Sequence, residues 1–257
     1  MIPAGSFPNP SAQGFSWPNA RTAAALSAAA YALIPTIYSP HTDAEVLVQD
    51  DANFICVAFR GSEELKDYLQ DGKIMMDELI TLTDGSVARV HSGFLQDFNS
   101  INEQLTNYVR AALGSTLTPG RKLIITGHSL GAALAVLCAL EFEKMGLPVA
   151  WVFTFGQPRV GNDVFASIYN SSLGGRTFRI VNAGDPVPLM PPYLAGYRDE
   201  LPAIVLPVGG GSVMNASNWE WVKYYLATWW KQLGKMKLWD FPDHRIGEYQ
   251  RRIQLLA

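Results

Sequence analysis

RKLIITGHSLGAALAVLCAL, residues 121–140, joins two apolar runs through a corner that carries one serine between two glycines. The run LIIT predicts a short strand, and the Ala- and Leu-rich run over 130–145 predicts a helix. A chain that turns from strand to helix within a few residues holds the apical residue in a strained conformation with an exposed side chain. Gly127 and Gly131 supply the small residues this corner needs, because neighbouring backbone passes close by. Ser129 is therefore a candidate nucleophile; the alternative is an idle serine in a glycine-flanked turn.

Strand-like and helix-like segments alternate along the rest of the chain. Further strands are predicted at 46–48, 54–59, 149–155, 177–182 and 204–208, and further helices at 22–34, 91–113, 161–173, 219–234 and 243–254. This alternation predicts an α/β fold, with a central, largely parallel sheet flanked by helices. The 257 residues fit one domain over 1–257. Functional sites in such folds form at the carboxyl ends of the strands.

Composition excludes several classes of protein. Hydrophobic residues make up 48% and charged residues 17%, which is typical of a globular chain. The net charge of -3 comes without a basic stripe, which argues against a nucleic-acid partner. Cys56 and Cys138 lie in apolar runs and are expected to be buried free thiols. No Cys or His cluster has metal-ligand spacing, so we expect no metal site.

The stretch TAAALSAAAYALI, residues 22–34, has the length of a signal-peptide core. It starts late, after a lead without positive charge, and is interpreted as a core helix closed by Pro35. It is also shorter than the about 20 residues needed to cross a bilayer, so no transmembrane segment is predicted.

A nucleophilic serine needs a base, and chain order selects one. The expected order is serine, then an acid, then histidine. Of the four histidines, only His244 lies after the serine; the alternative is a surface histidine. His128 is its neighbour on the corner, and its side chain is expected to point away.

The acid is less constrained by order alone. Asp185 follows the strand at 177–182 and is expected on the same rim as Ser129, so we favour it. The other aspartates beyond the corner are Asp163, Asp199, Asp240 and Asp243. Asp163 has the position of a helix-start charge, and the last two flank His244 too closely for the usual geometry, although Asp243 is a possible cap of its helix.

Two backbone N–H groups are needed to hold the oxyanion that forms when a serine attacks a carbonyl. Leu130 supplies one, as the residue after the nucleophile. The strand FICVAF ends in Arg60-Gly61-Ser62, which makes Ser62 the candidate for the second donor, with its hydroxyl as a third; the alternative is an ordinary turn.

Six segments in order resemble the class 3 lipases, the fungal-type triacylglycerol lipase family of α/β-hydrolases. They are the Ala-rich first helix, VAFRGS, VHSGFLQDF, ITGHSLGAALA, TFGQPRVGN and RIVNAGDPVPLMPP, followed by a histidine near the C-terminus. The resemblance puts the family's trio on Ser129, Asp185 and His244 and its oxyanion donors on Ser62 and Leu130. It implies a serine carboxylester hydrolase without cofactor, acting on lipid esters at an oil–water or membrane surface. Feruloyl and other short-chain esterases, or a non-catalytic lipid-binding module, are the alternatives.

Two segments are candidates for surface contact. Family members usually carry a short lid, and the matching stretch is 63–80, where Leu65, Tyr68 and Leu69 recur at helical spacing; the alternative is a plain surface helix. An aromatic helical insertion is predicted at about 212–240, with Trp221, Tyr225 and Trp229 on one face. Its aromatic side chains are suited to a lipid interface, to the wall of an acyl pocket, or to packing on the core.

Overall fold

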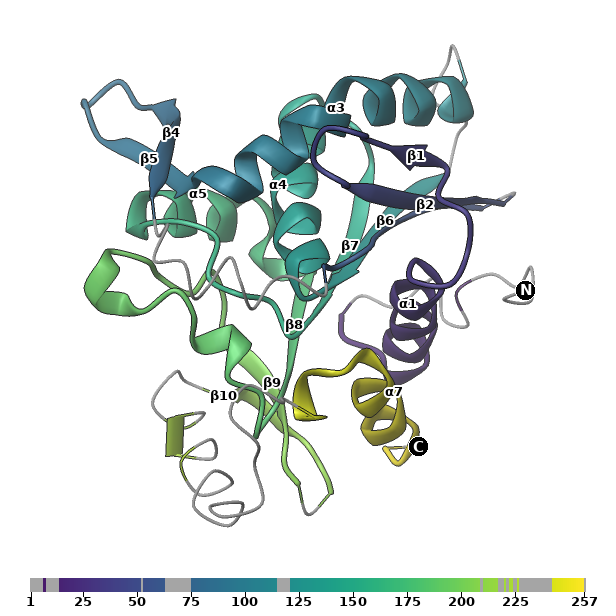
Figure 1. The fold of residues 1–257 in the computed structure, drawn as a ribbon, viewed down its shortest axis with the longest axis vertical. Coiled ribbons are helices and arrows are strands. Elements are labelled where there is room, and N and C mark those ends of the chain that lie inside the picture. The colour runs from purple at the N-terminus through teal and green to yellow at the C-terminus, as the bar shows by residue number, and fades with distance from the viewer. Residues whose placement is uncertain are drawn as a thin grey trace.

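The computed structural model describes residues 7, 14–51, 53–62, 75–114, 121–208, 210–216, 220, 222, 223, 226 and 242–256. Its centre is a mostly parallel sheet of eight strands in the order β1-β2-β3-β6-β7-β8-β9-β10 (Figure 1). The strands are β1 (Ile37–Tyr38), β2 (Glu45–Asp50), β3 (Phe54–Phe59), β6 (Lys122–His128), β7 (Val149–Phe155), β8 (Thr177–Asn182), β9 (Ala203–Leu206) and β10 (Val213–Ala216). From β3 to β9 neighbouring strands run parallel, and the strands at each edge run antiparallel. The predicted α/β architecture is confirmed.

Helices cover both faces of this sheet. They are α1 (Trp17–Ala29), α3 (Ser92–Leu113), α4 (Leu130–Lys144), α5 (Asp163–Leu173) and α7 (Ile246–Gln254), with short 3-10 turns η1 (Gly174–Arg176), η2 (Val187–Leu189), η3 (Tyr193–Ala195) and η4 (Pro242–His244). The helices α3, α4 and α5 pack together on one face, and α1 packs with α7 on the other (Figure 1). The Ala-rich segment is thus a core helix, as predicted, but the helix begins at Trp17 and ends at Ala29, before the predicted stop at Pro35.

The side chains of β3 point alternately to the two faces of the sheet, and all of them are apolar, so both faces need to be covered. Ile55 and Val57 pack into the α3–α4 core, whereas Cys56 and Ala58 face the α1–α7 side. Each large apolar side chain removed from water stabilises the fold by about 1.5–3 kcal/mol, so a strand with no polar face requires helices on both sides. Cys56 and Cys138 are both free and buried, as expected.

A second, two-stranded sheet was not predicted. The antiparallel strands β4 (Met76–Thr81) and β5 (Val87–His91) form a hairpin that projects at the upper left of Figure 1. Residues 76–80 of the lid candidate 63–80 lie in this strand rather than in a helix, and 63–74 lie outside the described residues. The remaining lid candidate therefore ends before β4.

The predicted aromatic insertion at about 212–240 also begins with a strand, because β10 pairs with β9 at the edge of the main sheet. Most of the rest, including Trp221, Tyr225 and Trp229, lies outside the described residues. Across the part of the chain that the structure describes, no helix is both long enough and apolar enough to cross a membrane.

Candidate active site

Ser129 occupies the corner between β6 and α4, in the left-handed region of backbone conformation at φ 61° and ψ -130°. The flanking glycines are required by close approach: a Cβ on Gly127 would lie 2.1 Å from the Gly131 carbonyl oxygen. A Cβ on Gly131 would lie 2.4 Å from the Phe59 carbonyl oxygen at the end of β3. Together these contacts hold the serine at the N-terminus of α4, where the helix dipole favours developing negative charge.

Three candidate residues from distant segments form one hydrogen-bonded chain. The Ser129 hydroxyl lies 2.8 Å from Nε2 of His244, and Nδ1 of His244 lies 2.8 Å from Oδ2 of Asp185. Ser129 and Asp185 are almost fully buried, so the prediction of an exposed serine at this corner is wrong. Because a carboxylate accepts, Nδ1 of His244 donates to it, which leaves Nε2 free to accept the serine proton.

Asp185 is held by two further donors. Its Oδ1 accepts the backbone N–H of Val187 at 2.9 Å, and its Oδ2 accepts the hydroxyl of Tyr249 at 2.6 Å. Burial and then the charge of Asp185 raise the pKa of Tyr249 well above its usual value, so Tyr249 keeps its proton and donates. The tyrosine lies on α7, and nothing in its local sequence pointed to this contact.

Gly156 is a second residue that the sequence did not reveal as part of the site. It follows β7 directly and has φ +60°, and a Cβ there would lie 2.9 Å from Oδ2 of Asp185 and 3.0 Å from Nδ1 of His244. Any side chain at this position would therefore displace the histidine–aspartate pair. Its position at the carboxyl end of a buried strand was the available signal.

His128 points away from Ser129, as predicted, and it contacts the loop that carries His244. Its Nε2 donates to the His244 carbonyl oxygen at 2.5 Å, so its Nδ1 accepts the hydroxyl of Tyr31 at 2.8 Å. Burial, and then the neighbouring His244, lower the pKa of His128 well below its usual value, which keeps the ring neutral and this tautomer in place. A side chain of the corner thus fixes the backbone of the candidate base.

The His244 loop has two other anchors. Asn182 donates to the Asp243 carbonyl oxygen at 2.7 Å, and Asp243 forms a buried ion pair with Arg252 of α7. Asp243 therefore pairs with a helix side chain rather than capping α7, whose N-cap is Arg245.

The alternative acids are placed elsewhere. Asp199 is buried between Arg159 at 3.2 Å and Arg179 at 2.8 Å. Burial acts to raise its pKa, but the two guanidinium groups outweigh burial and hold the pKa below its usual value. Asp163 is the first residue of α5, as predicted, and Asp240 lies outside the described residues.

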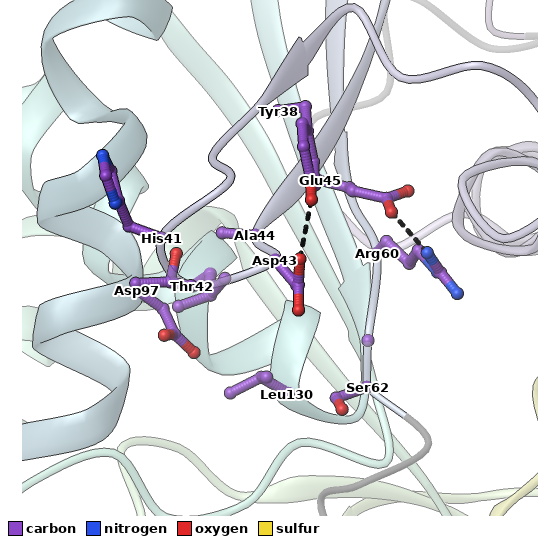
Figure 2. Close-up of a pocket in the computed structure, with 12 residues that line it drawn as sticks. Tyr38, His41, Thr42, Asp43, Ala44, Glu45, Arg60, Ser62, Asp97 and Leu130 are labelled. Carbon is purple, nitrogen blue, oxygen red and sulfur yellow. Dashed lines mark hydrogen bonds and ion pairs between the residues drawn. The ribbon is translucent and has the colours of Figure 1, made fainter.

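Ser62 and Leu130, the candidate oxyanion donors, line one cavity of about 620 Å³ beside the corner (Figure 2). The end of β3 passes directly by the nucleophile, because a Cβ on Gly61 would lie 3.0 Å from the Cβ of Ser129. Both candidate N–H donors therefore belong to segments that meet at Ser129. Within the described ranges no group of three or more His, Cys, Asp or Glu side chains could hold a metal ion.

The family model described as "Lipase (class 3)" matches residues 56–195, from β3 to the loop beyond Asp185. The chain belongs to the class 3 lipase family. The matched residues contain the corner, Ser62 and Asp185, and the resemblance inferred from the six motifs is thereby confirmed.

Named relatives and solved structures support the same family. The chain is 39% identical over 120 residues to the secreted mono- and diacylglycerol lipase 1 of Fusarium solani, covering 47% of this chain and 35% of that protein. The crystal structure of a lipase from Rhizopus microsporus var. chinensis superposes with a TM-score of 0.61 at 28% identity, covering 75% of this chain and 71% of that one. A structure described as a serine protease triad forming the catalytic centre of a triacylglycerol lipase superposes equally well, with a TM-score of 0.61 at 28% identity over 72% of this chain and 77% of that one. The fold is that of an α/β-hydrolase. The chain spans less than half the length of the curated lipase relatives it matches.

Proposed function

We propose that the chain is a serine carboxylester hydrolase that cleaves acyl esters of lipids, as a triacylglycerol lipase does. The observation that carries this proposal is the unbroken chain of two 2.8 Å hydrogen bonds from Ser129 through His244 to Asp185 at a strained strand–helix corner. An idle serine has no need of a buried histidine–carboxylate pair at its hydroxyl.

The proposed reaction runs through an acyl-enzyme. Ser129 Oγ attacks the ester carbonyl while Nε2 of His244 takes its proton, and Asp185 keeps the imidazole oriented and stabilises its positive charge. The backbone N–H groups of Leu130 and Ser62 stabilise the oxyanion, aided by the N-terminus of α4. His244 then protonates the leaving alcohol and later activates a water that releases the acid. No cofactor takes part.

Lipid substrates and contact with a lipid surface are proposed from two observations. The named relatives are acylglycerol lipases. Several large apolar side chains are also exposed, among them Ile34, Met75 and Leu194. Such side chains at the protein surface are suited to an oil–water or membrane interface, with the segment before β4 as the candidate lid.

A second candidate is an esterase for short or polar acyl groups. It is favoured by the cavity next to Ser62 and Leu130, whose lining includes Asp43, Glu45 and Asp97, an unusual wall for a long hydrocarbon chain.

The test is hydrolysis of p-nitrophenyl esters from acetate to palmitate and of a triglyceride emulsion, with Ser129→Ala as the blank. We expect wild-type turnover and loss of it by a factor of about 10⁴ or more in the variant at unchanged melting temperature. Activity that persists on long chains and rises at the emulsion surface favours the lipase, and activity confined to short soluble esters favours the esterase. No wild-type turnover on any of these esters would favour the non-catalytic module.

A further inference from the structure

The cavity beside the candidate oxyanion donors is polar, and it is bounded by segments on three sides. Twelve residues line it: Tyr38, His41, Thr42, Asp43, Ala44, Glu45, Arg60, Gly61, Ser62, Asp97, Leu130 and Leu134. They come from the end of β1, the start of β2 and the loop between them, from the segment that follows β3, and from the helices α3 and α4 (Figure 2). Its only large apolar lining is Leu130 and Leu134 from α4, within the part of the wall that the structure describes.

Most polar groups of this wall already have partners. Glu45 pairs with Arg60 at 2.5 Å, and Asp43 accepts the hydroxyl of Tyr38 at 2.7 Å, as the dashed lines in Figure 2 mark. The hydroxyl of Thr42 lies 2.7 Å from that of Ser100 on α3. These groups already have hydrogen-bond or ion-pair partners within the protein.

Among the buried residues of this wall, Asp97 of α3 is the exception. The residue is 3% exposed. Burial is the only cause of its pKa shift, and no residue that the structure describes donates a hydrogen bond to its carboxyl group. In Figure 2 the carboxyl group is turned into the cavity, on the side of Leu130. Burial raises the pKa of Asp97 to about 7. A buried carboxyl group without a partner is costly, and a ligand that supplies a hydrogen bond would relieve that cost.

The position of His244 shows which part of the ester, the acyl group or the leaving alcohol, enters the cavity. The leaving alcohol must stay close to Nε2 of His244, because that atom protonates it. None of the described residues of the His244 loop, 242–245, lines the cavity, whereas both oxyanion donors do. The cavity therefore lies on the acyl side of the carbonyl.

We propose that Asp97 is a specificity residue that selects acyl groups carrying a hydroxyl, which hydrogen-bonds its carboxyl group inside this cavity. This inference rests on the proposed ester hydrolysis. An unsubstituted hydrocarbon chain in the same place leaves the buried carboxyl group without a partner and is disfavoured.

The test uses a pair of esters that differ by one group. p-Nitrophenyl 6-hydroxyhexanoate and p-nitrophenyl heptanoate have the same length and differ only in a terminal hydroxyl or methyl; shorter and longer pairs of the same design locate the best reach. The measured quantity is the ratio of the two kcat/KM values, hydroxyl over methyl. Ionisations of the catalytic residues act on both esters and cancel in this ratio.

We expect the wild-type protein to favour the hydroxyl ester and Asp97→Leu to lower the ratio about tenfold, mainly through faster hydrolysis of heptanoate. Asp97→Asn keeps a hydrogen-bonding side chain without the charge, so it should retain part of the preference. Glu103→Gln removes a carboxylate from the exposed face of the same helix and should leave the ratio unchanged. Melting temperatures report whether each variant folds.

The ratio should also depend on pH. Below pH 7 Asp97 is mostly protonated, and above it the carboxylate accepts a hydroxyl more strongly, so the wild-type ratio should rise from pH 6 to pH 8. The other titratable or charged groups around the cavity are Tyr38, His41, Asp43, Glu45 and Arg60, and they remain in Asp97→Asn, whose ratio should be flat. An equal ratio in wild type and Asp97→Leu for every chain length would overturn the inference while leaving ester hydrolysis intact. Failure of the wild type to hydrolyse any ester would overturn the proposed function and this inference with it.

Discussion

The two sides of Ser129 are built differently. On the histidine side the protein itself holds the key groups: Asp185 accepts three hydrogen bonds, and the His244 carbonyl oxygen accepts one from the ring of His128. On the oxyanion side lies an open, polar cavity, and Asp97 faces it with no partner among the described residues. The same type of side chain is therefore fixed by the protein on one side and left for a ligand on the other. Catalytic groups need a fixed orientation, whereas a polar group can select among substrates only if the protein leaves it without a partner.

Of the variants that test this comparison, the largest effect on kcat is expected for Asp185→Asn. An amide cannot hold the imidazole of His244 in the required tautomer, so kcat should fall by about 10³–10⁴-fold with little change in fold. Steady-state kinetics on a soluble ester measures kcat, and circular dichroism reports whether the fold is unchanged.

The matched control is Asp199→Asn, which weakens a buried ion pair away from the triad. It should lower the free energy of unfolding by about 3 kcal/mol and leave kcat of the folded protein nearly unchanged. A large loss of kcat in this variant, with normal activity in Asp185→Asn, would mean that the acid has been misassigned.

A smaller effect is expected for Tyr249→Phe, which removes the 2.6 Å hydrogen bond to Asp185 and keeps the ring. Because Tyr249 acts by positioning Asp185, kcat should fall about tenfold while KM stays constant, and the free energy of unfolding should fall by about 1–2 kcal/mol.

Tyr169→Phe is the control for this variant, since Tyr169 is equally buried but lies on α5 and bonds Thr177, the first residue of β8. It should cost similar stability without a change in kcat. Equal kcat values for the two variants would show that Tyr249 is only a packing residue.

The elements that carry strong periodicity were predictable from the sequence. The strands at 54–59 and 149–155 match β3 and β7, because segments buried on both faces are almost entirely apolar. The strand at 177–182 matches β8, although it carries the buried polar residues Arg179 and Asn182. That Ser129, Asp185 and His244 lie together could be predicted, because chain order and strand ends restrict the choices to a few residues.

What escaped prediction depends on tertiary contacts. The hairpin strand β4 is largely exposed, so its sequence contains no apolar run that would predict a strand. Tyr249 and Gly156 gain their roles only when α7 and β7 meet at Asp185, far apart in sequence. Asp97 could have been recognised from the sequence. It lies three residues after Phe94 and four before Ile101, on the apolar face of α3, where a charged residue is unusual.

The central claim is that Ser129 is an activated nucleophile, and covalent labelling tests it most directly. A fluorophosphonate probe, followed by peptide mass spectrometry, reports which side chain reacts and how fast. We expect one label per chain, on Ser129, and a labelling rate reduced by orders of magnitude in His244→Ala. Absence of label on Ser129 in the folded wild-type protein, or an undiminished rate in His244→Ala, would contradict it.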